Sequence, residues 1–103
     1  MDPLIPEIAA LSKLSHRRIF HVLQSDSPRH YELTKCLANI LYNICTVQSI
    51  EVSATQKKLL EQHIHIVQDL LSRKVSLASK KSLFELHIPL VVLLASTCHQ
   101  LLD

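Results

Sequence analysis

Apolar residues recur at intervals of three and four along most of the chain, which is the spacing of one face of an α-helix. Three stretches carry this period over residues 6–24, 28–46 and 54–74, and a fourth begins between residues 72 and 82 and runs to the C-terminus. Four amphipathic helices joined by short connections are typical of an antiparallel bundle. We therefore expect an all-α fold, specifically an antiparallel four-helix bundle, built as a single helical domain over residues 1–103.

Capping signals place several of the helix ends. Ser53 and Gln56 fit a capping box, in which each side chain satisfies a free backbone N–H of the other residue. Ser27 followed by Pro28 predicts another helix start. Ser12 and Ser15 can each restart a helix, so a break near residues 13–15 is compatible with the pattern. Residues 47–52 lose the helical period and are expected to form an extended connection.

The last stretch, residues 83–102, is apolar on every side and is either a membrane span or a core helix. Its uninterrupted apolar part covers only residues 90–95, whereas a span needs about 20 mainly apolar residues. It has no flanking Trp, and no Lys or Arg follows it. We expect no membrane span and a last helix that is mostly buried. Pro89 lacks the N–H that would bond back to Glu85, so a kink or a fresh helix start is expected there.

Composition supports one folded helical core. The chain has no Gly, 48% hydrophobic residues and 19% charged residues. The hydrophobic and charged contents are typical of globular proteins. The absence of Gly is unfavourable for the tight turns of β-hairpins. The formal net charge of +2 is too small to indicate a nucleic-acid binder. Residues 1–7 lack the positive charge and apolar run of a signal peptide. The three cysteines, Cys36, Cys45 and Cys98, are expected to be buried reduced thiols, which suits an intracellular protein in the cytoplasm or nucleus.

Candidate catalytic and metal-binding residues give no recognisable pattern. His63 and His65 are two residues apart and would point to opposite sides of a continuous helix. A pair formed between helices, for example His65 with His87, stays open. The carboxylates are scattered, and the absence of Gly excludes the usual phosphate loops. We therefore expect no enzyme, no cofactor and no metal site.

Three basic doublets are the least ordinary feature. Each falls in or near the first turns of a predicted helix, where the helix dipole is positive and a cation is unfavourable by about 0.3–1 kcal/mol. An anionic group at the helix start would compensate this cost. No aromatic residues interleave the doublets, so base stacking is poorly served by the sequence. The candidate anion- or partner-binding residues are Arg17, Arg18, Lys57, Lys58, Lys80 and Lys81.

The function expected from these patterns is that of a non-catalytic helical interaction or regulatory module. The apolar last helix needs cover on every side, and an uncovered remainder would mark an interface with another protein or with a second copy, most simply as a homodimer. One alternative is an accessory nucleic-acid-binding protein that uses the basic doublets. Another is a fragment of a helical-repeat scaffold of the HEAT type, because the helix pairs recur at a similar spacing.

Overall fold

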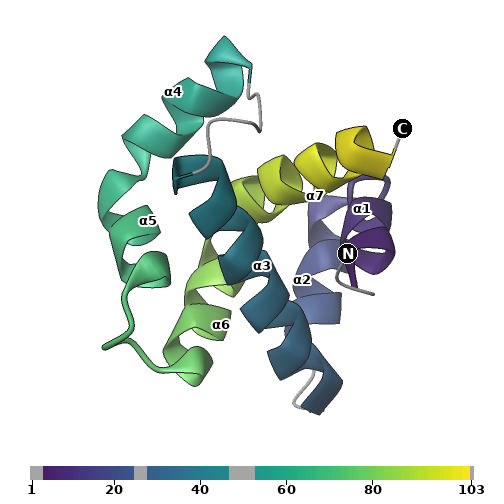
Figure 1. Cartoon of the computed structure of the whole chain (residues 1–103). Helices are drawn as coiled ribbons and strands as arrows, with labels where there is room; N and C mark the ends of the chain where they lie inside the picture. The colour runs from purple at the N-terminus through teal and green to yellow at the C-terminus, as the bar shows by residue number, and fades with distance from the viewer. Residues whose placement is uncertain (1–3, 25–27, 47–52, 103) are drawn as a thin grey trace.

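The computed structural model describes residues 4–24, 28–46 and 53–102. These residues form seven α-helices and no strand, which confirms the all-α prediction (Figure 1). The predicted connection over residues 47–52 and the Ser27 cap lie outside the described residues. The helices are α1 (Ile5–Leu11), α2 (His16–Gln24), α3 (Pro28–Thr46), α4 (Ala54–Gln62), α5 (Ile64–Leu71), α6 (Leu77–Leu86) and α7 (Ile88–Leu102).

The prediction of an antiparallel four-helix bundle is wrong. Only α3 matches one of the four predicted long helices, and each of the other three is divided into two shorter helices. The predicted last helix is divided most clearly, because the axes of α6 and α7 make an angle of 96° at the break between them. Figure 1 shows α3 and α7 running in clearly different directions. The apolar period could not reveal these breaks, because it continues across them.

Local hydrogen bonds account for the first break. The Ser12 hydroxyl donates to the Ala9 carbonyl oxygen at 2.7 Å and so closes the end of α1. The Ser15 side chain then accepts a hydrogen bond from the Arg18 N–H at 3.3 Å. A side-chain oxygen that accepts from the N–H three residues ahead is the bond of a helix N-cap. The break allowed by the sequence near residues 13–15 is therefore present.

Histidines occupy the other two breaks. His63 separates α4 from α5 with φ −114° and ψ 30°, and His87 separates α6 from α7 with φ −128° and ψ 59°. Pro89 is the second residue of α7, where its missing N–H costs no helical hydrogen bond. The chain has thus taken the fresh start that Pro89 permits, and the predicted kink near Pro89 is confirmed.

Helix α7 is the central element of the core. It packs most extensively against α1 and also contacts α2, α3, α4 and α6. The expected burial of the last helix holds for α7 but not for the α6 part, where only Lys81 and Phe84 are buried. The buried residues of α7 are Ile88, Leu90, Val91, Leu93, Leu94, Ala95, Thr97 and Cys98. Repeat scaffolds contact only sequential neighbours. The packing of the first helix on the last one therefore disfavours a solenoid segment.

None of the helices in the described part of the chain is by itself both long enough and apolar enough to cross a membrane; α6 and α7 reach that length and composition only together, across their 96° bend.

Candidate functional site

Helix α4 lies at the edge of the molecule and packs less tightly than the others. Its start is fixed by the predicted capping box: Ser53 Oγ accepts from the Gln56 N–H at 3.1 Å, and Gln56 Oε1 accepts from the Ser53 N–H at 3.0 Å. None of its nine described residues is buried. It contacts α5 and α7 only over short segments. The helix is therefore well capped but covers little of the core.

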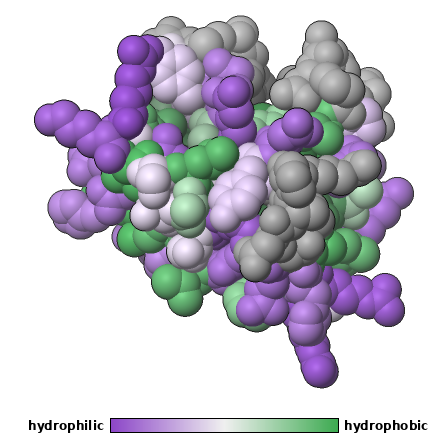
Figure 2. All heavy atoms as spheres, turned by 90° about the horizontal axis from the view of Figure 1, so that it is seen from below, coloured by the Kyte–Doolittle hydropathy of each residue, from purple (hydrophilic) through white to green (hydrophobic). Residues whose placement is uncertain are grey.

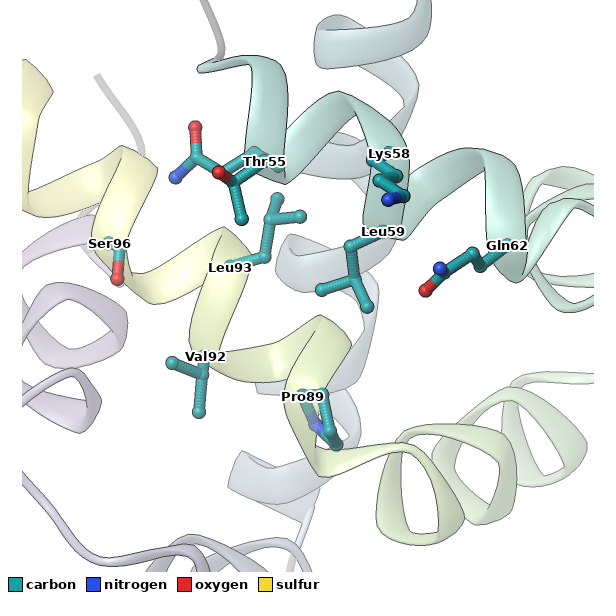
Figure 3. Close-up of a pocket in the computed structure, with 9 residues that line it drawn as sticks. Thr55, Lys58, Leu59, Gln62, Pro89, Val92, Leu93 and Ser96 are labelled. Carbon is teal, nitrogen blue, oxygen red and sulfur yellow. The ribbon is translucent and has the colours of Figure 1, made fainter.

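A groove of about 460 Å³ lies between α4 and α7. The residues on each wall follow the spacing i, i+3, i+4 and i+7, which places them on one face of a helix. Gln56 also reaches the groove. Figure 3 shows α4 and α7 on opposite sides of the space, with Leu93 of α7 pointing toward α4. The α4 wall consists of Thr55, Lys58, Leu59 and Gln62, and the α7 wall consists of Pro89, Val92, Leu93 and Ser96.

The groove combines an apolar interior with a polar rim. Leu59 and Leu93 extend into the space between the two helices from opposite walls (Figure 3). Val92 and Pro89 continue the apolar surface along α7. Among the described residues that line the groove, Lys58 carries the only formal charge, and its side chain is exposed. The arrangement can bury apolar groups and receive a negative charge at one side.

The six residues of the basic doublets are dispersed among three helices. Arg17 and Arg18 lie exposed in the first turn of α2, and Lys57 and Lys58 lie exposed near the start of α4. Lys58 alone among these four lines the groove. The prediction that the doublets bind an anion or a partner stays a prediction.

The third doublet contains a lysine whose charge is already compensated. Lys81 is only 6% exposed, and its Nζ lies 2.7 Å from Glu85 Oε1, one helical turn further along α6. Pairs at i and i+4 share a helix face, so the sequence spacing was sufficient to suggest this ion pair. Lys80 is half-buried and belongs to another surface. The two lysines of this doublet therefore have different surroundings.

None of the three cysteines forms a disulfide, and they are not all buried. Cys36 and Cys98 are buried as predicted, whereas Cys45 is exposed, and the prediction of burial is wrong there. Cys45 follows half-buried Ile44 on α3, and one position along a helix turns a side chain by about 100° away from its neighbour. Desolvation raises the pKa of Cys98 to about 11 and also raises the pKa of Cys45. Neither thiol is thus activated as a thiolate.

Two histidines from different helix pairs are in contact. The rings of His63 and His87 meet edge to face with their centroids 5.7 Å apart. His65, the other candidate partner of His87, is exposed. Residues two apart lie on nearly opposite sides of a helix, so only one of the two histidines can face His87. No group of three or more His, Cys, Asp or Glu side chains with metal-binding geometry occurs in the part of the chain that the structure describes.

The sequence pattern does not reveal the groove as a site. The α4 wall lies at one edge of a broad apolar face, and the α7 wall belongs to a helix that is apolar on all sides. Apolar periodicity therefore does not distinguish the residues of the groove from the residues of the core. The usable signal was the i, i+3 and i+7 spacing of Thr55, Lys58 and Gln62, which share a helix face with Leu59. No protein-family model, curated protein or solved structure matches the chain.

Proposed function

We propose that this protein is a non-catalytic helical interaction module and that the groove between α4 and α7 binds an amphipathic helical segment of a partner protein. The observation that carries the proposal is the pair of facing stripes, each with the i, i+3, i+4, i+7 spacing. Grooves with an apolar floor between two helices are a recurring way of binding a third helix.

The dimensions and chemistry of the groove support a helical occupant. Its α4 wall extends from Thr55 to Gln62. A helix rises by about 1.5 Å per residue, so this wall is about 10 Å long. Two turns of a partner helix can lie along it, with apolar side chains against Leu59 and Val92. The polar rim would then face the polar side of the same helix.

Charge complementarity favours a partner with an acidic residue. Lys58 stands exposed at the rim, and no carboxylate is present among the described residues that line the groove. An aspartate or glutamate on the occupant would gain an attractive interaction with Lys58. A second copy that placed its own α4 in the groove would bring two lysines, Lys57 and Lys58, and one carboxylate, Glu61, so the helix facing Lys58 would carry a net positive charge. A foreign acidic helix is therefore favoured over a second copy.

The weak packing of α4 also supports a binding role. A helix with no buried residue in its described part can shift to widen or narrow the groove at little cost in core packing. An occupant would bury apolar surface that α4 now leaves to solvent. Binding would therefore be expected to order α4 as well as to fill the groove.

A selection experiment tests this proposal. A displayed library of 16-residue helical peptides would be selected on the wild-type chain and counter-selected on Val92→Glu, which places a charge in the apolar wall. We expect enriched peptides to carry apolar residues at i, i+3 or i+4 and i+7 together with an acidic residue. Failure to enrich any peptide that distinguishes wild type from Val92→Glu would contradict the proposal.

Self-association, a regulatory role and an intracellular location remain predictions. Light scattering at micromolar concentration tests the first of these directly. A dimer whose formation is blocked by Val92→Glu would identify a second copy as the occupant and would overturn the argument from charge. A monomer that binds the selected peptides would support the foreign partner.

A further inference from the structure

A second surface, formed by α3, α5 and α6 and the turn between α5 and α6, carries a concentration of positive charge. Two adjoining hollows of about 300 and 390 Å³ share Ala38, Asn39 and Lys80 as common walls. Tyr42 and Arg73 lie in the first hollow, and Lys35 lies in the second. The three helices that form this surface contact one another, with α5 and α6 on the left of Figure 1 and α3 crossing its centre. We call its polar residues the basic hollow: Lys35, Asn39, Tyr42, Arg73 and Lys80.

The charge in the basic hollow is not compensated by its own walls. Lys35, Arg73 and Lys80 come from three separate segments, and no carboxylate lines either hollow among the described residues. Lys81 offers the contrast, because Glu85 pairs with it on the adjacent part of α6. Three like charges gathered in a concave surface raise the local concentration of anions. The net charge of the chain, only +2, does not reveal that three cationic side chains cluster on this surface.

Neutral groups in the basic hollow favour a ligand that carries an aromatic ring and hydrogen-bonding groups in addition to negative charge. Tyr42 is 55% exposed, which leaves a large part of its ring uncovered beside the cations. An exposed aromatic ring next to Lys and Arg is the arrangement by which proteins stack nucleobases while holding phosphates. The Asn39 side chain is exposed at the wall shared by both hollows. Its amide can donate and accept hydrogen bonds.

The underside of the molecule does not offer one large apolar surface. Figure 2, which views the molecule from below, shows green apolar patches separated by purple polar side chains. The sequence could not show the hollow, since Lys35 and Tyr42 are about 30 to 45 residues from Arg73 and Lys80.

We propose that the basic hollow binds single-stranded nucleic acid, with phosphates on Lys35, Arg73 and Lys80 and a base stacked on Tyr42. Two adjoining hollows bounded by three cations suit more than one nucleotide. Unpaired bases are required, because a ring that is to stack on Tyr42 must be free of its own duplex partner. This site is separate from the groove between α4 and α7, so either proposal can fail without the other.

Fluorescence polarisation with a labelled ten-nucleotide single strand tests the site in the full-length chain. Because each phosphate contact contributes about −0.7 to the log–log salt slope, three contacts predict roughly a 20-fold loss of affinity between 50 and 200 mM salt. We expect Tyr42→Ala to weaken binding about tenfold and Tyr42→Phe, which keeps the ring, to bind like wild type. The triple change Lys35→Ala, Arg73→Ala and Lys80→Ala should abolish binding at 200 mM salt.

Controls distinguish this site from general cationic attraction. Lys13→Ala removes an exposed charge in the turn between α1 and α2, outside both hollows, and should weaken binding less than twofold. Circular dichroism melts confirm that each variant is folded. Adenosine monophosphate should compete only weakly, since it supplies a single phosphate; competition equal to that of the oligonucleotide would overturn the proposal of a strand and replace it by a mononucleotide. Absence of binding at 50 mM salt, or equal binding by wild type and Tyr42→Ala, would also overturn it.

Discussion

His63 and His87, the residues at which two helix pairs are interrupted, contact each other with ring centroids 5.7 Å apart and an interplanar angle of 74°. His63 Nδ1 also lies 3.1 Å from the Leu59 carbonyl oxygen. Because a carbonyl only accepts, this nitrogen donates. Gln62 and Pro89, at one end of the groove, are sequence neighbours of this region. The contact therefore ties the end of α4 to the start of α7.

A double-mutant cycle on these rings should show measurable coupling. Edge-to-face ring pairs contribute about 0.5–1.5 kcal/mol beyond the area they bury. We expect His63→Ala and His87→Ala to be non-additive by about 0.5–1 kcal/mol in urea unfolding, because either change alone removes the contact. His65→Ala, at an exposed position of α5, is the control and should have an effect near zero. If the two changes in the free energy of unfolding were strictly additive, the contact between the rings would contribute nothing to stability.

The two serine caps should have different consequences although their hydrogen bonds are alike. Ser53 caps α4, which has no buried residue in its described part, and Ser76 caps α6 by accepting from the Ser79 N–H at 3.1 Å. Loss of such a cap costs about 1 kcal/mol. We expect Ser76→Ala to lower the global free energy of unfolding by about that amount, since α6 buries Phe84. Ser53→Ala should instead leave the global value nearly unchanged.

Hydrogen exchange measures the local effect of the α4 cap. In Ser53→Ala the amides of α4 should lose protection while those of α7 keep it, because α4 can open without exposing the core. Equal loss of protection in α4 and α7 would show that α4 unfolds only with the whole molecule.

The ion pair between Lys81 and Glu85 predicts an asymmetry between single and double substitutions. The Lys81 side chain is 8% exposed, so removing its partner leaves a nearly buried charge without compensation. We expect Glu85→Ala to cost about 2–3 kcal/mol. The combined change Lys81→Met and Glu85→Leu should cost much less, because it removes both charges. Chemical denaturation checks this, and an equal cost for the single and double changes would contradict it.

The thiols should differ in accessibility and in their effect at alkaline pH. A maleimide should label exposed Cys45 in the native protein and reach buried Cys36 and Cys98 only after unfolding. Burial raises the pKa of Cys98 to about 11 from an ordinary value of 9.0. The folded state therefore retains a proton that the unfolded state loses between pH 9 and 11, and stability falls as the pH rises through this window.

Substitution of Cys98 isolates this contribution from other groups that titrate at alkaline pH. The Cys98→Ala variant should lose less stability than the wild type between pH 9 and 11, when each is compared with its own value at pH 8. Parallel stability curves for the two proteins would show that the thiol does not contribute.

The sequence was informative about local structure and weak about assembly. The Ser53 capping box and the bounds of α3 were predicted because they depend on residues close together in the chain. The break at His63 was not predicted, because the apolar period continues across it and tertiary packing decides where the helices part. The break beside His87 was predicted, because Pro89 cannot continue a helix from the preceding turn. Cys45 was assigned to the core from its apolar neighbour, although one position on a helix changes the facing direction by about 100°.

Neither candidate binding surface could be predicted from the sequence, because each is formed by residues that only helix packing brings together. Leu59 and Val92, on opposite walls of the groove, are brought together only by the packing of α4 on α7. Tyr42 is likewise brought beside Arg73 only by the packing of α3 on α5. Amphipathic patterns specify which face of each helix is apolar, but they do not specify which helix it meets.

Charge reversal at the groove rim tests the central claim most directly. Affinities of a selected acidic helical peptide and of its acid-to-lysine counterpart would be measured against wild type, Lys58→Glu and Lys57→Glu. Lys57 is exposed on the same helix but does not line the groove, so it is the matched control. We predict that Lys58→Glu weakens the acidic peptide about tenfold and restores binding of the lysine peptide, whereas Lys57→Glu changes either affinity less than threefold. Equal effects of the two reversals, or no effect of Lys58→Glu, would contradict a binding site between α4 and α7.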